Sequence, residues 1–160
     1  DLLVSEEKVK GYRNFANKVW NAARFVLTNF ELESQKSKLN KEDAWILEKT
    51  KTTIKKVTHF IERYRFDLAA EEIYHFFWHT FCDQYIEQYK LKSQKLKVKS
   101  YWILLYVLEN SLKLLHPFMP FLTETIWQIA RQQTNHLHKN PDGQANFFKE
   151  EALIVASWPK

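Results

Sequence analysis

Four polar residues near the start of the chain are spaced so that a helix would carry them on one side. Arg13, Asn17, Asn21 and Arg24 follow one another at intervals of four, four and three residues, which matches the 3.6-residue period of an α-helix. Arginine pairs with phosphate and stacks on bases, and an asparagine amide can bond to a base edge. The spacing of this Arg/Asn face therefore predicts a surface that contacts nucleic acid.

Aromatic side chains border the Arg/Asn face, and a cation precedes it. Trp20 lies on one flank and Phe25 on the other, where an exposed ring would offer an unpaired base a stacking surface. Lys8 adds a positive charge before the face begins. Two exposed asparagines inside a helix cost roughly half a kcal/mol each relative to alanine, so we expect a ligand to offset that cost.

The same pattern has interpretations that need no RNA. A polar helix face can be buried against a neighbouring helix, with its amides hydrogen-bonded inside a bundle. The face can also dock a partner domain, which would make the chain a helical protein-interaction module. RNA binding through several phosphates weakens steeply as salt rises, whereas apolar docking does not, so ionic strength separates these hypotheses.

An apolar stripe on the opposite side of the same helix indicates how the Arg/Asn face is positioned. Its eight members are predicted to be core residues: Tyr12, Phe15, Ala16, Val19, Ala22, Ala23, Val26 and Leu27. Similar periods later in the chain predict helices at about 5–30, 41–64, 67–90, 96–115 and 123–133, then a loop over 134–149 and an extended run over 152–158. The expected fold class is all-α, a five-helix antiparallel bundle forming one domain over residues 1–160.

Local signals predict where the helices begin and end. Ser5, Asn40, Asp67 and Thr123 are expected N-caps, because their side chains can accept hydrogen bonds from first-turn N–H groups. A helix should end just before Pro117, since proline disfavours helical backbone in the residue that precedes it.

The amino-acid composition limits which partners and which cellular compartment are expected for this chain. Lys and Arg number 24 against 19 Asp and Glu, a formal charge of +5 that permits an anionic partner. The single cysteine, Cys82, excludes an internal disulfide framework and indicates a reduced, cytoplasmic compartment. No apolar run approaches the roughly 20 residues of a membrane-spanning helix. We expect a monomer, and the opening Asp1 is consistent with a piece of a longer chain.

The helix expected over 67–90 is apolar around most of its circumference, so we expect it at the centre of the bundle. It carries His75, His79 and Cys82 at intervals of four and three, with Asp83 adjacent, which is a conceivable metal-ligand spacing. Because these residues stand among large aromatic side chains, and one helix would have to supply three ligands, we expect no metal site.

Other polar groups do not indicate catalysis. Glu71 and Glu72 are adjacent and point to different sides of a helix, so they do not form an acid and base facing one substrate. The chain has two glycines and no phosphate-binding loop. The lysines of residues 91–100, namely Lys92, Lys95, Lys97 and Lys99, are expected to be solvated.

Three stretches carry a family resemblance when they are taken together. They are GYRNFANKVWNAARFVL at 11–27, RFDLAAEEIYHFFWHTFCDQYIE at 65–87 and LLHPFMPFLTETIW at 114–127. They resemble the anticodon-binding domain of the valyl-tRNA synthetases, in the class I group that also contains the isoleucyl and leucyl enzymes. The closing ALIVASWP is also similar, so the resemblance covers essentially the whole chain.

The resemblance implies a helical bundle that follows a catalytic domain and grips the anticodon stem-loop of valine tRNA. In such domains the pair matching Arg24 and Phe25 lies against the second and third anticodon bases, Arg24 as hydrogen-bond donor and cation and Phe25 as stacking surface. Position along the same helix adds four further candidates, namely Asn21, Asn17, Arg13 and Lys8.

The resemblance also implies what this chain lacks. The parent enzyme attaches valine to its tRNA with ATP and magnesium, but the catalytic domain that uses them is not in this sequence. We therefore expect no cofactor and no catalysis in this chain, and we expect the missing catalytic domain as a second partner. The sequence departs from the family pattern at Glu6 and Glu7, where basic residues are common, at Gln84, where an aromatic residue is common, and in a longer loop over 134–149.

Overall fold

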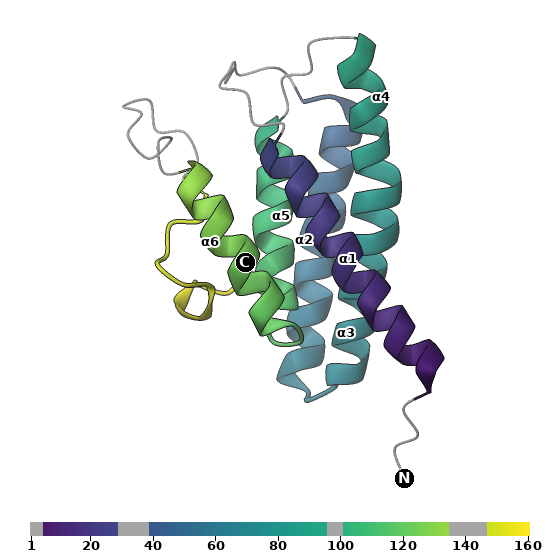
Figure 1. Cartoon of the computed structure of the whole chain (residues 1–160), viewed down its shortest axis with the longest axis vertical. Helices are drawn as coiled ribbons and strands as arrows, with labels where there is room; N and C mark the ends of the chain where they lie inside the picture. The colour runs from purple at the N-terminus through teal and green to yellow at the C-terminus, as the bar shows by residue number, and fades with distance from the viewer. Residues whose placement is uncertain (1–4, 29–38, 96–100, 135–146) are drawn as a thin grey trace.

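The computed structural model describes residues 5–28, 39–95, 101–134 and 147–160, and all regular structure in these ranges is helical. The elements are α1 (Glu6–Thr28), α2 (Lys41–Glu62), α3 (Phe66–His75), the π-helix η1 (Phe76–Ile86), α4 (Glu87–Lys95), α5 (Tyr101–Leu115), α6 (Pro120–Thr134) and the 3₁₀ turn η3 (Leu153–Val155). Because α3, η1 and α4 form one continuous segment, the bundle has five long helical segments, which alternate in direction along the chain (Figure 1). The prediction of an all-α, five-helix bundle is confirmed.

Several predicted boundaries lie outside the described residues. They are the end of the first helix at 29–30, the linker over 31–38, the start of the fourth helix at 96–100, and most of the loop over 134–149. Within the described ranges the helix ends agree with the sequence to within a few residues, except that the third helix runs on to Lys95.

The first helix is capped and buried much as its sequence predicts. The Ser5 hydroxyl oxygen accepts a hydrogen bond from the Lys8 backbone N–H at 3.3 Å. The buried residues are Phe15, Val19, Ala22, Ala23, Val26 and Leu27. The assignment of Tyr12 to the core was wrong, because 70% of this residue is exposed. In Figure 1 the start of α1 lies at the edge of the bundle, and Tyr12 belongs to this part of the helix.

The second helix begins with a complete capping box. The Asn40 side chain accepts a hydrogen bond from the Asp43 N–H at 2.7 Å, and the Asp43 carboxylate accepts one from the Asn40 N–H. The same carboxylate is buried and accepts a 2.8 Å hydrogen bond from the hydroxyl of Tyr85 in η1. The start of α2 is therefore tied to the middle of the third helical segment.

Two predicted caps were wrong. The cap position of α3 is Arg65, and Asp67 lies in the first turn, where its carboxylate pairs with the Arg65 guanidinium at 2.9 Å. The last helix begins at Pro120, because proline suits a first helical position, which needs no backbone N–H. Thr123 is instead buried, and its hydroxyl donates to the Met119 carbonyl at 2.9 Å.

The π-helix η1 was not predicted. A period of 3.6 residues describes an α-helix, whereas a π-helix closes i→i+5 hydrogen bonds and turns more slowly. Its buried residues are Phe76, Phe77, Phe81, Cys82, Tyr85 and Ile86. Cys82 is a buried free thiol whose burial raises its pKa to about 12, so its assignment to the core is confirmed.

The centre of the bundle is α5 rather than the segment over 67–90. Ten residues of α5 are buried, and α5 packs against α1, α2, α3, η1 and α6. The 66–95 segment keeps an open side that carries His75, His79 and Asp83. Among its large aromatic residues, Phe76, Phe77, Phe81 and Tyr85 are buried, whereas Tyr74 and Trp78 pack against Phe15 of α1.

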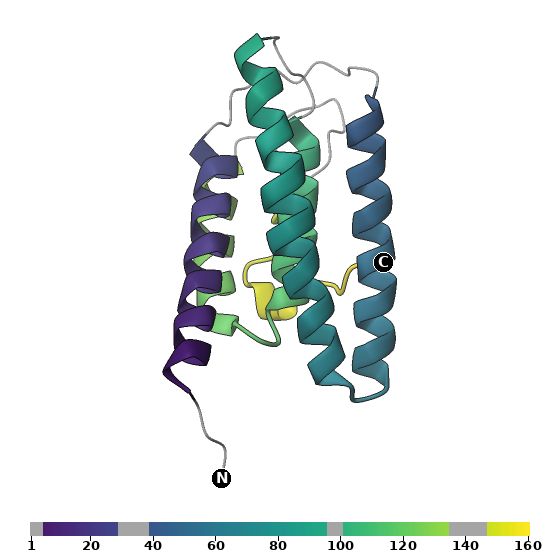
Figure 2. The same ribbon diagram turned by 90° about the vertical axis from the view of Figure 1, so that its right-hand side faces the viewer.

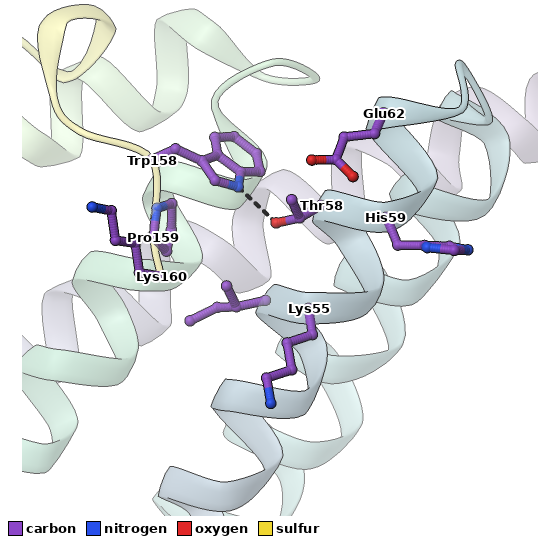
Figure 3. A pocket seen from close by; sticks show the side chains of 8 residues that line it. Lys55, Thr58, His59, Glu62, Trp158, Pro159 and Lys160 are labelled. Carbon is purple, nitrogen blue, oxygen red and sulfur yellow. Dashed lines mark hydrogen bonds between the residues drawn. The ribbon is translucent and has the colours of Figure 1, made fainter.

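The C-terminal segment packs along the bundle without forming a strand in its described part. The expected extended run contains the 3₁₀ turn η3, and the expected polar loop ends in two buried residues, Phe147 and Phe148. Phe148 packs edge-on against Trp127 with ring centroids 4.9 Å apart. The indole N–H of Trp158 donates to the Thr58 hydroxyl at 2.8 Å, which joins the tail to α2 (Figure 3).

An ion pair holds α1 against η1. The Lys18 ammonium lies 2.7 Å from an Asp83 carboxylate oxygen and 5.4 Å from the centre of the Trp78 ring. Burial alone would raise the pKa of the Asp83 carboxyl, but the hydrogen bond and charge of Lys18, with a hydrogen bond from His79, lower that pKa below its usual value. The ionised form of Asp83 is therefore favoured in the folded protein.

Removing the Tyr85 hydroxyl should destabilise the bundle. We expect Tyr85→Phe to lower the free energy of unfolding by about 1.5–3 kcal/mol, because the buried Asp43 carboxylate loses a donor. Urea unfolding followed by circular dichroism measures the change. The matched control is Tyr12→Phe, whose residue is 70% exposed and which should leave stability unchanged. Equal stability of the two variants would show that the Tyr85–Asp43 hydrogen bond does not stabilise the bundle.

The Lys18–Asp83 coupling should depend on pH. A double-mutant cycle with Lys18→Met and Asp83→Asn should give a coupling free energy of about 0.2–1 kcal/mol at pH 7, because both partners are partly exposed and screened. Since the folded pKa of Asp83 is lowered, this stabilisation is present above the unfolded pKa of about 4 and is lost as pH falls through the folded pKa. Urea unfolding at pH 7 and pH 3 checks this, and a coupling that grows at pH 3 would show that the pair is not ionic.

Candidate nucleic-acid interface

The Arg/Asn face lies on the outside of the bundle. Arg13, Asn17, Asn21 and Arg24 are all exposed, as is Lys8 before them. The opposite stripe of α1 packs against α5, α6 and η1, and α1 and α2 lie on opposite sides of the molecule (Figure 2). The interpretation of these polar residues as a buried network between helices is therefore wrong.

The cations of this face are not neutralised by neighbouring acids. Within the described ranges, neither Arg13 nor Arg24 takes part in an ion pair, whereas Lys18, on the flank of α1, is engaged by Asp83. Guanidinium groups in this state keep all five N–H donors available for phosphates or base edges. The face can therefore bind an anion without first breaking a salt bridge.

Phe25 differs from the expectation of an open stacking surface. Its side chain is half-buried and packs against the core. The Lys90 ammonium of α4 lies 4.9 Å from the centre of its ring, and the same ammonium lies 2.7 Å from a Glu87 carboxylate oxygen. One helical step of 100° separates Phe25 from Arg24, which turns the ring from the exposed face toward α4.

The last turn of α1, which carries Arg24 and Phe25, is anchored by side chains. The Tyr101 hydroxyl of α5 donates a hydrogen bond to the Val26 carbonyl, and the Thr28 hydroxyl donates to the Arg24 carbonyl at 2.8 Å. Burial raises the pKa of Tyr101, so its hydroxyl remains a donor at neutral pH. The Tyr101 bond satisfies a carbonyl group that the helix end leaves unpaired, and both bonds fix the backbone beneath the candidate residues.

The sequence missed Lys90 as a neighbour of the site. Lys90 and Phe25 lie far apart in the chain, and only the packing of α4 beside α1 brings the ammonium over the ring. The sequence offered one indirect signal, the acidic residue Asp83. In the structure its ion pair with Lys18 marks the face of the 66–95 segment that meets α1. The sequence alone did not show which residue on the helical turns after Asp83 would reach Phe25.

The histidines and the cysteine of the 66–95 segment do not form a metal centre. Cys82 is buried, whereas His75 and His79 are exposed and pair with Glu71 and Asp83 at 3.7 and 3.3 Å. No three His, Cys, Asp or Glu side chains gather around one point in the part of the chain that the structure describes. Likewise, no described helix is both long enough and apolar enough to span a bilayer.

A shallow groove lies on the other side of the molecule, between α2 and the C-terminal residues (Figure 3). Its lining residues are Ile54, Lys55, Thr58, His59, Glu62, Trp158, Pro159 and Lys160. Acidic and basic groups are mixed along it, so it has no uniform charge that would select an anion. The sequence did not predict this groove, because the two walls are about 100 residues apart and meet only in the folded chain.

Comparison with known proteins agrees with the geometry. A family model described as the anticodon-binding domain of tRNA ligase matches residues 43–160. The match begins inside α2, so α1 lies outside it. Relatives align over the whole chain: the valine-tRNA ligases of Pseudothermotoga lettingae, Thermotoga maritima and Fervidobacterium nodosum are 48%, 46% and 44% identical to it.

The chain spans only 17% of the length of each of these three curated relatives. It is thus similar to one segment of much longer proteins, and that segment includes the α1 residues of the candidate interface. The family match, the full-length alignments and the helical bundle agree with one another. This chain belongs to the family of anticodon-binding domains of tRNA ligases, domains that bind tRNA, and it is homologous to that of the valine-tRNA ligases.

Proposed function

We propose that this chain binds the anticodon stem-loop of valine tRNA, as one domain of a valine-tRNA ligase. The observation that carries the proposal is the Arg/Asn face, whose four residues are exposed on a rigid helix and whose two arginines form no ion pair within the described residues. From Arg13 to Arg24 the face extends about 16 Å along the helix at 1.5 Å per residue, which is long enough to touch more than one nucleotide.

Each residue of the face is suited to a different part of the RNA by the chemistry of its side chain. Arg24 presents its guanidinium to a base edge or phosphate at the anchored end of α1, and the exposed part of Phe25 offers a ring to the adjoining base. Asn21 and Asn17 offer amides that can both donate and accept hydrogen bonds. Arg13 and Lys8, nearer the start of α1, supply charge for backbone phosphates.

The remaining activities of such an enzyme belong to other parts of a longer chain. In this proposal the attachment of valine, with its ATP and magnesium, takes place in a catalytic domain outside these 160 residues. That domain is the second partner, and we expect the whole enzyme to act in the cytoplasm as a monomer. The exposed Arg/Asn face could instead dock a protein domain, and the salt dependence of binding tests that alternative.

Arg24→Ala should weaken RNA binding without unfolding the domain. We expect a loss of about 1–3 kcal/mol in the affinity for a valine anticodon hairpin, the typical value of a bidentate contact. The melting temperature should stay within about 2 °C, because an exposed surface substitution rarely changes stability by more than about 0.5 kcal/mol. Fluorescence titration at two salt concentrations measures the affinity, and Lys49→Ala on the far helix α2 is the control. If Arg24→Ala binds as tightly as Lys49→Ala, the proposed interface is wrong.

Phe25→Leu separates stacking from packing. Leucine keeps apolar bulk where the ring packs against the core, so the stability loss should remain below about 1.5 kcal/mol. The affinity for the same hairpin should fall by about 1–3 kcal/mol, because leucine cannot stack on a base. Unchanged hairpin affinity together with a large drop in melting temperature would assign Phe25 to the core alone.

A further inference from the structure

We propose that Lys90 of α4 is a further RNA-contacting residue, which exchanges its contact with the Phe25 ring for a phosphate when a base stacks on that ring. This inference rests on the proposed function. It begins from two distances: the Lys90 ammonium lies 4.9 Å from the centre of the Phe25 ring and 2.7 Å from the Glu87 carboxylate. Nothing in the sequence pattern of α1 assigns this residue to the interface.

The position of Lys90 makes the candidate site a two-helix site. Phe25 turns away from the exposed line of the Arg/Asn face toward the 66–95 segment, which lies next to α1 (Figure 2). The aromatic ring therefore has Lys90 of α4 beside it in space, and Arg24 is one residue before it on α1. A nucleotide whose base reaches Phe25 brings its own phosphate into the field of both cations.

Three lysines of the described residues each combine an acidic partner with an aromatic ring. Lys113 pairs with Glu109 and faces Trp127, but only 14% of its side chain is exposed, so it serves the core. Lys18 pairs with Asp83 and faces Trp78, and this bond joins α1 to η1. Lys90 differs from Lys113 because 40% of its side chain is exposed, and from Lys18 because its acidic partner lies on its own helix.

The Lys90–Glu87 pair can be broken at little cost. It joins residues three apart on one helix, and 40% and 57% of the two side chains are exposed; such solvated pairs contribute little to stability. A phosphate is a strong partner for an ammonium, and base stacking on an aromatic ring is stronger than an exposed cation–π contact. The complex is therefore favoured when a base replaces the Lys90 ammonium on the Phe25 ring and the ammonium moves to a phosphate.

The first experiment measures charge at this position. Lys90→Gln should reduce affinity for the valine anticodon hairpin about three- to tenfold at low salt. It should also reduce the slope of log affinity against log salt by about 0.7–0.9, the value for one neutralised phosphate. Lys90→Arg keeps the positive charge and should restore most of the affinity and most of the salt slope. Reduced affinity with an unchanged salt slope would mean that Lys90 only supports the structure, and would overturn the proposal.

The second experiment changes the acidic partner. Glu87→Gln removes the ion pair that competes with a phosphate for the Lys90 ammonium, and it removes a negative charge beside the expected phosphate, so hairpin affinity should rise about two- to threefold at low salt. The combination of Glu87→Gln with Lys90→Gln should lose that gain. If Glu87→Gln leaves the affinity unchanged, the proposal that Lys90 moves from the Phe25 ring to a phosphate is contradicted.

The control separates this inference from the proposed function. Lys56 also forms an exposed ion pair, with Glu72 at 3.1 Å. It belongs to α2, which lies across the bundle from α1 (Figure 2), and Lys56→Gln should leave affinity and salt slope unchanged. If Arg24→Ala weakens binding while Lys90→Gln behaves like Lys56→Gln, the role of Lys90 is wrong and the interface stands. If neither Arg24→Ala nor Lys90→Gln weakens binding, the proposed function itself fails.

Discussion

The structure depends on the burial of one apolar stripe of α1 against three other helical segments. Phe15, Val19 and Val26 are buried against the bundle formed by α5, α6 and η1. Side chains that are buried on this scale each contribute about 1.5–3 kcal/mol, far more than any surface contact of the same helix. Because the period of the helix is fixed, burial of this stripe also fixes the direction of every other residue on α1. The exposed polar face is therefore a consequence of the core.

Polar contacts then refine the position that the core sets. Lys18 and Asp83 join α1 to the π-helix, and Tyr101 bonds to the Val26 carbonyl at the end of α1. These contacts lie on both sides of the α1 segment that carries Asn21 and Arg24, so they hold the exposed Arg/Asn face in place although its own side chains have no buried partners. A rigid helix loses little conformational freedom on binding, which is the advantage of placing recognition residues on such an element.

The π-helix has a structural consequence for the same site. A wider turn places Phe77, Phe81, Tyr85 and Ile86 all toward the interior, while His79 and Asp83 remain on the open side. The open side of this segment runs beside α1 and brings Lys90 over Phe25. π-helical turns are often found at functional sites, and here the turn lies in the segment that carries Lys90, next to the proposed interface.

The sequence by itself determined the fold class, the buried and exposed sides of α1, and the caps at Ser5 and Asn40, because these follow from local periodicity and local hydrogen bonding. It also determined the family, through stretches that its relatives share. Tertiary structure alone decided that Tyr12 is exposed, that Thr123 is a buried bonding residue rather than a cap, and that Phe147 and Phe148 enter the core. It alone decided that Phe25 is half-buried, with the Lys90 ammonium 4.9 Å from the centre of its ring. The burial of Phe147 and Phe148 and the partial burial of Phe25 depend on contacts between distant segments, and local periodicity does not show which distant side chain will fill a given space. The hydrogen bond of Thr123 is local, but only the packed bundle shows that this residue is buried.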